Sequence, residues 1–172
     1  AGHYIYAETS YGTVGGYGKD YGLRTPIVDA TTVSVISATF YYHMYGSNCG
    51  KLRLQHSQDP LFTDGTVTDI PVQWGDAITN YAANPAVSPD YNLATSTGSI
   101  YSDGPTAHRH WRHAKANLSQ YGGTKFYLRF FYNAGNGYLG DVALDNISVF
   151  AENVTGMSLY AHNNIHVVTS SL

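Results

Sequence analysis

The chain has 172 residues, enough for one domain with a buried core. Charged residues make up 12% of it, about half the usual share, while glycine and tyrosine number 18 and 16. The formal net charge of −3 argues against a nucleic-acid-binding protein, which normally has a basic surface. No apolar run reaches the roughly 20 residues that span a bilayer.

The first half of the sequence shows strand patterns separated by glycine-rich loops. His3–Thr9 alternates as a strand does and leads into a glycine-rich loop, 11–22. Thr31–Tyr45 is β-branched and aromatic, which predicts one long central strand. Lys51–Gln55 places Leu52 and Leu54 on one face.

The middle of the chain combines a turn signal with a long irregular stretch. Asp64-Gly65 predicts a hairpin between strands at Leu61–Thr63 and Thr66–Trp74. Ile78–His108 is rich in Asn, Pro, Ser and Thr and is interpreted as an extended surface loop.

Two strands are predicted near the end of the main domain. Lys125–Tyr132 alternates, with every second side chain apolar. In Val142–Phe150 the apolar positions change parity between Leu144 and Ile147. One extra residue, a β-bulge at Asp145-Asn146, would return all the apolar side chains to the core: Val142, Leu144, Ile147 and Val149.

The C-terminal extension follows this strand. Met157–His162 and Ile165–Ser170 are joined by Asn163-Asn164 and predict a terminal hairpin. We therefore divide the chain into a domain at 1–150 and an extension at 151–172.

Four segments, in order, resemble the MAM domain, an extracellular module of meprins, receptor tyrosine phosphatases and neuropilins. They are GHYIYAETS (2–10), FYYHMYGSNCGKLRL (40–54), Trp111 followed by Ala114 and Leu118, and FYLRFFYNAGNGYLGDVALDNISV (126–149). The resemblance implies an all-β fold, an antiparallel two-sheet β-sandwich of the jelly-roll type. It also implies a role in adhesion, receptor assembly or oligomerisation.

The chain departs from the family pattern in several places. MAM domains usually carry four paired cysteines, whereas Ser37 stands where one is expected and Cys49 is the single cysteine here. The segment between Trp74 and Trp111 is longer than usual, and the family's first strand would lie before Gly2. The β-branched run of the extension could fill that missing edge, either in its own domain or in a neighbour; the strand-exchange candidates are Ile165, Val167 and Thr169.

Glu8, Asp141 and Asp145 are the metal candidates. The resemblance implies a structural Ca²⁺ between an early strand and the last strand, as in some MAM domains and in jelly-roll carbohydrate-binding modules. Carboxylates and the carbonyls that a bulge releases are oxygen ligands of the kind this cation takes. Surface carboxylates that cap loops are the alternative interpretation.

Covalent modification and pairing are predicted at four positions. The N-x-[ST] sequons Asn117, Asn146 and Asn153 are glycosylation candidates in a secreted protein. No signal peptide is visible, so a secreted chain would be a processed form. Cys49 has no partner within the chain and is expected at a turn, which makes it a candidate for a disulfide between chains.

Histidines and tyrosines give weaker signals. His108, His110 and His113 flank Trp111 without a carboxylate or cysteine partner. We therefore favour solvent-exposed histidines at the start of a strand over a zinc site. Exposed aromatic rings could contact ligands, but the sequence does not say which of the eight candidates are exposed: Tyr4, Tyr6, Tyr11, Tyr17, Tyr21, Tyr41, Tyr42 and Tyr45.

These observations together predict a non-catalytic extracellular module. No hydrolase, zinc-protease, P-loop or CxxC motif occurs, so we do not expect an enzyme. The leading expectation is adhesion or self-assembly with itself or other extracellular proteins. The alternative is a calcium-bearing carbohydrate-binding module that recognises glycans.

Overall fold

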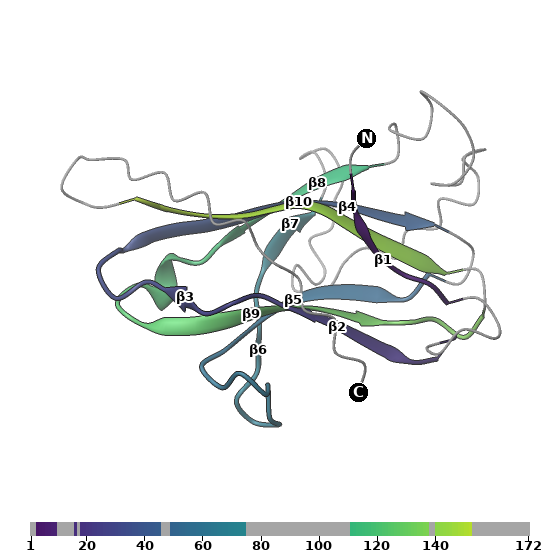
Figure 1. Ribbon diagram of the computed structural model, residues 1–172, viewed down its shortest axis with the longest axis horizontal. Helices are drawn as coiled ribbons and strands as arrows, with labels where there is room; N and C mark the ends of the chain where they lie inside the picture. Colours follow the sequence, from purple (N-terminus) through teal and green to yellow (C-terminus); the bar gives the residue numbers. More distant parts are fainter. Residues whose placement is uncertain are drawn as a thin grey trace.

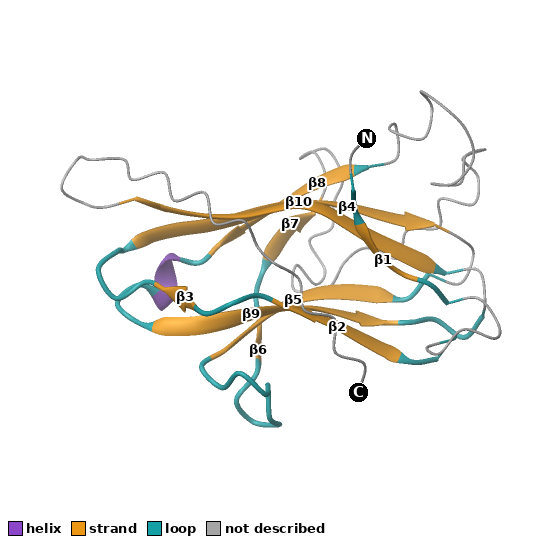
Figure 2. Cartoon of the chain, viewed as in Figure 1, coloured by secondary structure: helices purple, strands orange, loops and turns teal. Residues whose placement is uncertain are grey.

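The computed structural model of the chain describes residues 3–9, 16, 18–45, 49–74, 111–137 and 140–152. In these residues the chain forms two antiparallel β-sheets that pack face to face (Figure 1). Beside the strands, Figure 2 shows one short turn of 3-10 helix, η3 (Ser119–Tyr121). The predicted antiparallel two-sheet β-sandwich is confirmed.

The first sheet, which we call sheet A, has the strand order β1-β10-β4-β8-β7. The two long strands β10 and β4 lie side by side at its centre, and β1 covers only the first part of β10 on the other side. The bounds are β1 (Ile5–Ala7), β10 (Asp141–Glu152), β4 (Val35–Tyr45), β8 (Arg112–Asn117) and β7 (Val72–Trp74).

The second sheet, sheet B, has the order β2-β9-β5-β6, with β3 also paired to β9. Its central strand β9 pairs with β2 on one side and with β5 along seven residues on the other. The bounds are β2 (Asp20–Arg24), β3 (Val28–Asp29), β5 (Lys51–Ser57), β6 (Thr68–Asp69) and β9 (Lys125–Asn133).

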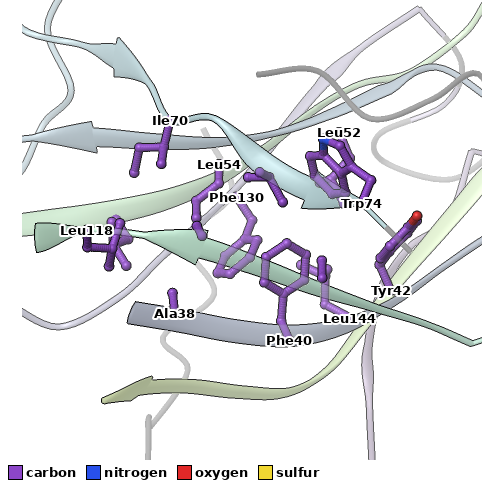
Figure 3. Close-up of a cluster of buried hydrophobic side chains, with 14 of the residues drawn as sticks. Ala38, Phe40, Tyr42, Leu52, Leu54, Ile70, Trp74, Leu118, Phe130 and Leu144 are labelled. Atoms are coloured by element: carbon purple, nitrogen blue, oxygen red, sulfur yellow. The ribbon is translucent and has the colours of Figure 1, made fainter. Parts of the chain in front are cut away.

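The core lies between the two sheets because both contribute alternate apolar side chains. Figure 3 shows Phe40 of β4, Phe130 of β9 and Trp74 of β7 pointing into the same space. The rings of Phe40 and Phe130 meet edge to face, with centroids 4.8 Å apart. Burial of each such side chain contributes roughly 1.5–3 kcal/mol to the stability of the fold. The alternation predicted for β9 is confirmed, since all its apolar inward positions are buried: Phe126, Leu128, Phe130 and Tyr132.

The predicted β-bulge is also confirmed. The pairing of β10 with β4 shifts between Asp145 and Ser148, and Asn146 has a φ of 50°. Two residues of β10, Asn146 and Ile147, thus oppose one residue of β4. The shift turns Ile147 and Val149 back toward the core, against which both pack.

Three boundary predictions were wrong, two of them because a local turn overrides the strand pattern. Thr31 and Thr32 form a turn, held by Asp29, whose Oδ1 accepts the amide and hydroxyl of Thr31. The long strand therefore begins at Val35. Asp64-Gly65 is a turn, with φ of 88° at Gly65, but it lies in the connection between β5 and β6.

Leu61–Thr63 is accordingly not a strand, and β5 continues to Ser57 instead. In the glycine-rich segment, Asp20–Gly22 already belongs to β2, in which Tyr21 and Leu23 pack against the core. Among the described residues no helix is long and apolar enough to cross a membrane. The segments 78–108 and 153–172 lie outside the described residues, so the predicted loop and terminal hairpin are not placed.

Candidate functional site

A pair of carboxylates lies where β1 ends and β10 begins. Ala7 pairs with Val142, so the next residues along the two strands, Glu8 and Asp141, lie opposite each other. The Asp141 carboxylate accepts hydrogen bonds from the Thr9 amide (2.9 Å) and the Thr9 hydroxyl (3.3 Å). These bonds fix the position of Asp141 beside Glu8.

The carboxylates of Glu8 and Asp141 are half-buried and close enough for their charges to interact. Burial raises the pKa of the Asp141 carboxyl, and the charge of Glu8 raises it further, while the bonds from Thr9 oppose the change. A proton is favoured on the pair because two negative charges repel. A bound cation would remove the same repulsion.

More oxygen atoms converge nearby. The Tyr21 hydroxyl lies 3.0 Å from the Glu8 carbonyl and 2.9 Å from the Gly16 carbonyl, so its one proton serves two acceptors. Carboxylate and backbone carbonyl oxygens are among the ligands that Ca²⁺ takes, and two carboxylates lie together here. Within the described parts of the chain there is no group of three or more His, Cys, Asp or Glu side chains that could hold a metal.

Asp145, the third metal candidate, lies elsewhere on the same strand. It follows Leu144, which pairs with Ile5 at the far end of β1. Four residues of strand separate it from Asp141, about 13 Å. Its Oδ1 accepts the amide of Asn146 at the bulge, at 2.7 Å. The register thus brings Glu8 to Asp141 and not to Asp145.

The neighbouring Cys49–Gly50 segment is tightly packed. A Cβ at Gly50 would lie 1.7 Å from the Asn133 carbonyl oxygen, so only glycine fits there. The Gly50 amide donates to the Tyr132 hydroxyl at 3.0 Å, and this hydroxyl donates to the Gly140 carbonyl at 2.5 Å. A buried chain of hydrogen bonds therefore ties the start of β5 to β9 and to the start of β10.

Cys49 is half-buried rather than fully exposed at a turn, and it packs against the core. Its Sγ lies 3.8 Å from the Asp141 carbonyl oxygen. Burial, with a smaller effect of the Asp141 charge, raises the pKa of the thiol to about 12. Disulfide exchange needs the thiolate, so this environment slows the predicted pairing between chains.

The glycosylation candidates occupy different surroundings. Asn117 is exposed at the end of β8, where its Oδ1 accepts the Ser119 amide at 2.9 Å. Asn146 is exposed at the bulge. Asn153 lies outside the described residues, as do His108, His110 and the strand-exchange candidates Ile165, Val167 and Thr169.

The structure separates the tyrosines that the sequence left together. Tyr42 is buried in the core, whereas Tyr4, Tyr6 and Tyr41 are exposed. The sequence could have separated these tyrosines by their alternation along the strand. Tyr41 and His43 alternate with Tyr42 and Met44, which face the other sheet. Parity alone could not show which face would be inward without the partner sheet.

The fold places the chain among all-β sandwich proteins. No protein-family model matches it, and no curated protein matches its sequence.

Proposed function

We propose that the chain is a non-catalytic extracellular module that associates with further copies of itself by strand addition. The observation that supports this proposal is the partial cover of β10. On the side away from β4, β1 pairs with Val142–Leu144 alone. Along Ser148–Glu152, none of the strands in the described residues lies on that side.

An uncovered strand offers its amide and carbonyl groups to another strand. Apolar surface is also available there, since Ile147, Val149 and Ala151 pack on the core but stay partly exposed. Strand addition joins main-chain groups by hydrogen bonds and lets alternate side chains fill the half-covered core.

The proposed occupant is the extension of a second copy, through Ile165, Val167 and Thr169. The run 165–169 is rich in β-branched residues and contains neither glycine nor proline. A contact in which the tail of one copy enters the edge of the next is head-to-tail, so it propagates into a filament unless the rotation closes a ring.

A structural Ca²⁺ at Glu8 and Asp141 belongs to the same proposal. It would hold the end of β1 to the start of β10 and relieve the repulsion between the two carboxylates. The role assigned to it is stabilisation of the edge strand, with no part in chemistry.

The experiment compares the full chain with Val167→Pro, which removes one strand-forming amide, and with Ser171→Pro outside the run as a control. Light scattering should give masses many times the 18.7 kDa of one chain for the full chain and the control, and the monomer mass for Val167→Pro. An excess of a peptide of residues 157–172 should also dissolve the assemblies.

Two outcomes would refute self-association through the tail. One is a full chain that stays monomeric at all concentrations, which would leave the extension folded on its own domain or unused. The other is assemblies that persist in Val167→Pro and in the presence of the peptide.

A further inference from the structure

Aromatic side chains gather on the outer face of sheet A, at the half that carries β1. Tyr4 and Tyr6 come from the β1 segment, with ring centroids 6.2 Å apart. Tyr41 of β4 lies 5.1 Å from His113 of β8. Trp111, just before β8, lies 5.7 Å from Tyr4 and thus joins the two edges of the group. We call these five side chains the aromatic face.

The sheet register explains why they share one side. Tyr42 and Met44 of β4 are buried in the core, so Tyr41 and His43 point outward. His43 is nevertheless 1% exposed, and the ring of Trp111 lies 5.7 Å from it. The outer rings therefore rest on a buried second layer rather than extending freely from the sheet.

The tyrosine rings remain accessible to a ligand. Tyr4, Tyr6 and Tyr41 are 36%, 46% and 40% exposed. The rings in contact are tilted by 53° to 66°, so they do not cover one another face to face. The stacked pair His56 and Tyr121 elsewhere in the molecule shows the contrast, with an angle of 7°.

The surroundings of the aromatic face are largely neutral. The register places Thr39 and Ser148 beyond the rings, with Asp145 and Lys115 as neighbours of opposite charge. The outer face of sheet B differs, since it carries a row of charged groups in which Arg53 lies 3.8 Å from Asp69 and Arg129 packs on Phe131. Among the described residues the neighbours Asp145 and Lys115 carry opposite charges, so the aromatic face favours a ligand without a strong net charge.

We infer that the aromatic face binds a neutral saccharide chain. A pyranose ring presents a patch of C–H groups, which the negative face of an aromatic ring attracts, and a rim of hydroxyls. The phenols, the His113 imidazole and the Asp145 carboxylate can exchange hydrogen bonds with that rim. From β1 to β8 the face crosses three strand spacings, about 14 Å, which suits a short oligosaccharide better than a single sugar.

The same chemistry makes a protein partner the weaker interpretation. Ala143 is the aliphatic residue that the register places between Tyr6 and His43, and it is 1% exposed. A protein docking here would bury few aliphatic side chains, so its contacts would rest on the tyrosine and tryptophan rings alone. This inference does not depend on self-association, which uses the edge of β10 rather than the outer face of the sheet.

The test begins with an array of neutral and acidic oligosaccharides probed with the full chain, followed by calorimetry on the strongest binder. Tyr6→Ala and Tyr41→Ala should each weaken binding at least about tenfold, because each removes an exposed ring. Tyr41→Phe should keep most of the affinity, since it retains the ring. Phe150→Ala is the matched control: Phe150 is 42% exposed on the same outer face, beyond the bulge, and its removal should leave the affinity unchanged.

Three results would overturn the inference. The first is an array in which no oligosaccharide binds. The second is binding that Tyr6→Ala and Tyr41→Ala leave unaltered. The third is a loss of self-association in these variants with no saccharide bound, which would identify the face as a protein interface. Assembly that persists while saccharide binding fails would refute this inference alone.

Discussion

In both halves of β10 every second side chain points into the core, but the two halves have different neighbouring strands. Before the bulge, β1 and β4 flank the strand, and Val142 and Leu144 are 4% and 7% exposed. After the bulge, the described strands pair with β10 through β4 alone, and Ile147, Val149 and Ala151 remain only partly buried. Parity decides which way a side chain points, whereas the strand beside it decides how far it is buried.

The largest expected effect comes from truncating one side chain in each half. Leu144→Ala should lower the free energy of unfolding by about 3 kcal/mol, because it leaves a cavity in the core beneath the half of β10 that β1 and β4 flank. Thermal unfolding of the monomer should then occur roughly 6–12 °C lower. Val149→Ala should cost about 1 kcal/mol, since its surroundings are already open.

This comparison has a second use in the assembled protein. If a strand of another copy covers the second half of β10, Val149→Ala should become more costly in the assembly than in the monomer. Equal losses for Leu144→Ala and Val149→Ala in the monomer would show that the two halves do not differ in stability.

Calcium should have the next largest effect on stability, through the carboxylates at the start of β10. At a concentration about a hundred times its dissociation constant, an ion that binds only the folded state adds about 2.7 kcal/mol to stability. Chelator followed by excess calcium should therefore lower and then raise the melting temperature of the wild type. An unchanged melting curve would remove the ion from the proposal.

Asp141→Asn should abolish this response, and Asp145→Asn should keep it. The raised pKa of the Asp141 carboxyl means that the folded state holds its proton more tightly than the unfolded chain does. This group therefore stabilises the fold below the unfolded pKa, near 3.8, and that stability is lost as pH rises through the folded pKa. Without calcium at neutral pH, Asp141→Asn should consequently melt at the wild-type temperature or above it.

The smallest effect concerns the end of the sandwich beyond the bulge. His56 stacks on Tyr121 with centroids 3.8 Å apart, and burial lowers the pKa of its imidazole. The unfolded chain takes up the proton near pH 6.5, so the contribution to stability is complete above that pH and decreases as pH falls below it. His56→Phe should make the pH dependence of melting shallower below pH 6.5. An identical slope in His56→Phe would show that this imidazole does not titrate on unfolding.

The sequence predicted the parts of the fold that depend on alternation. The inward side of β9 and the bulge at Asp145-Asn146 could be located because each follows from the spacing of apolar residues. The start of β4 could not, since the hydrogen bonds from Thr31 to Asp29 outweigh the β-propensity of the threonines. In the candidate site, the sequence identified Glu8, Asp141 and Asp145 as candidates, but the finding that Glu8 lies beside Asp141 and not beside Asp145 required a register that only the sheet defines.

The aromatic face shows the same limit. Parity groups Tyr41 with His43, but the approach of Trp111 to Tyr4 joins residues that are far apart in the sequence and crosses two strands. No local pattern carries that information.

The positions of the two tryptophans give the molecule two separate optical reporters. Trp74 is 3% exposed and meets Phe40 and Tyr42 edge to face, so its indole emits from an apolar interior. Trp111 is half-buried on the outer surface between Tyr4 and His43. Replacement of either indole by phenylalanine leaves a single fluorophore, which reports on the core in one variant and on the outer surface of sheet A in the other.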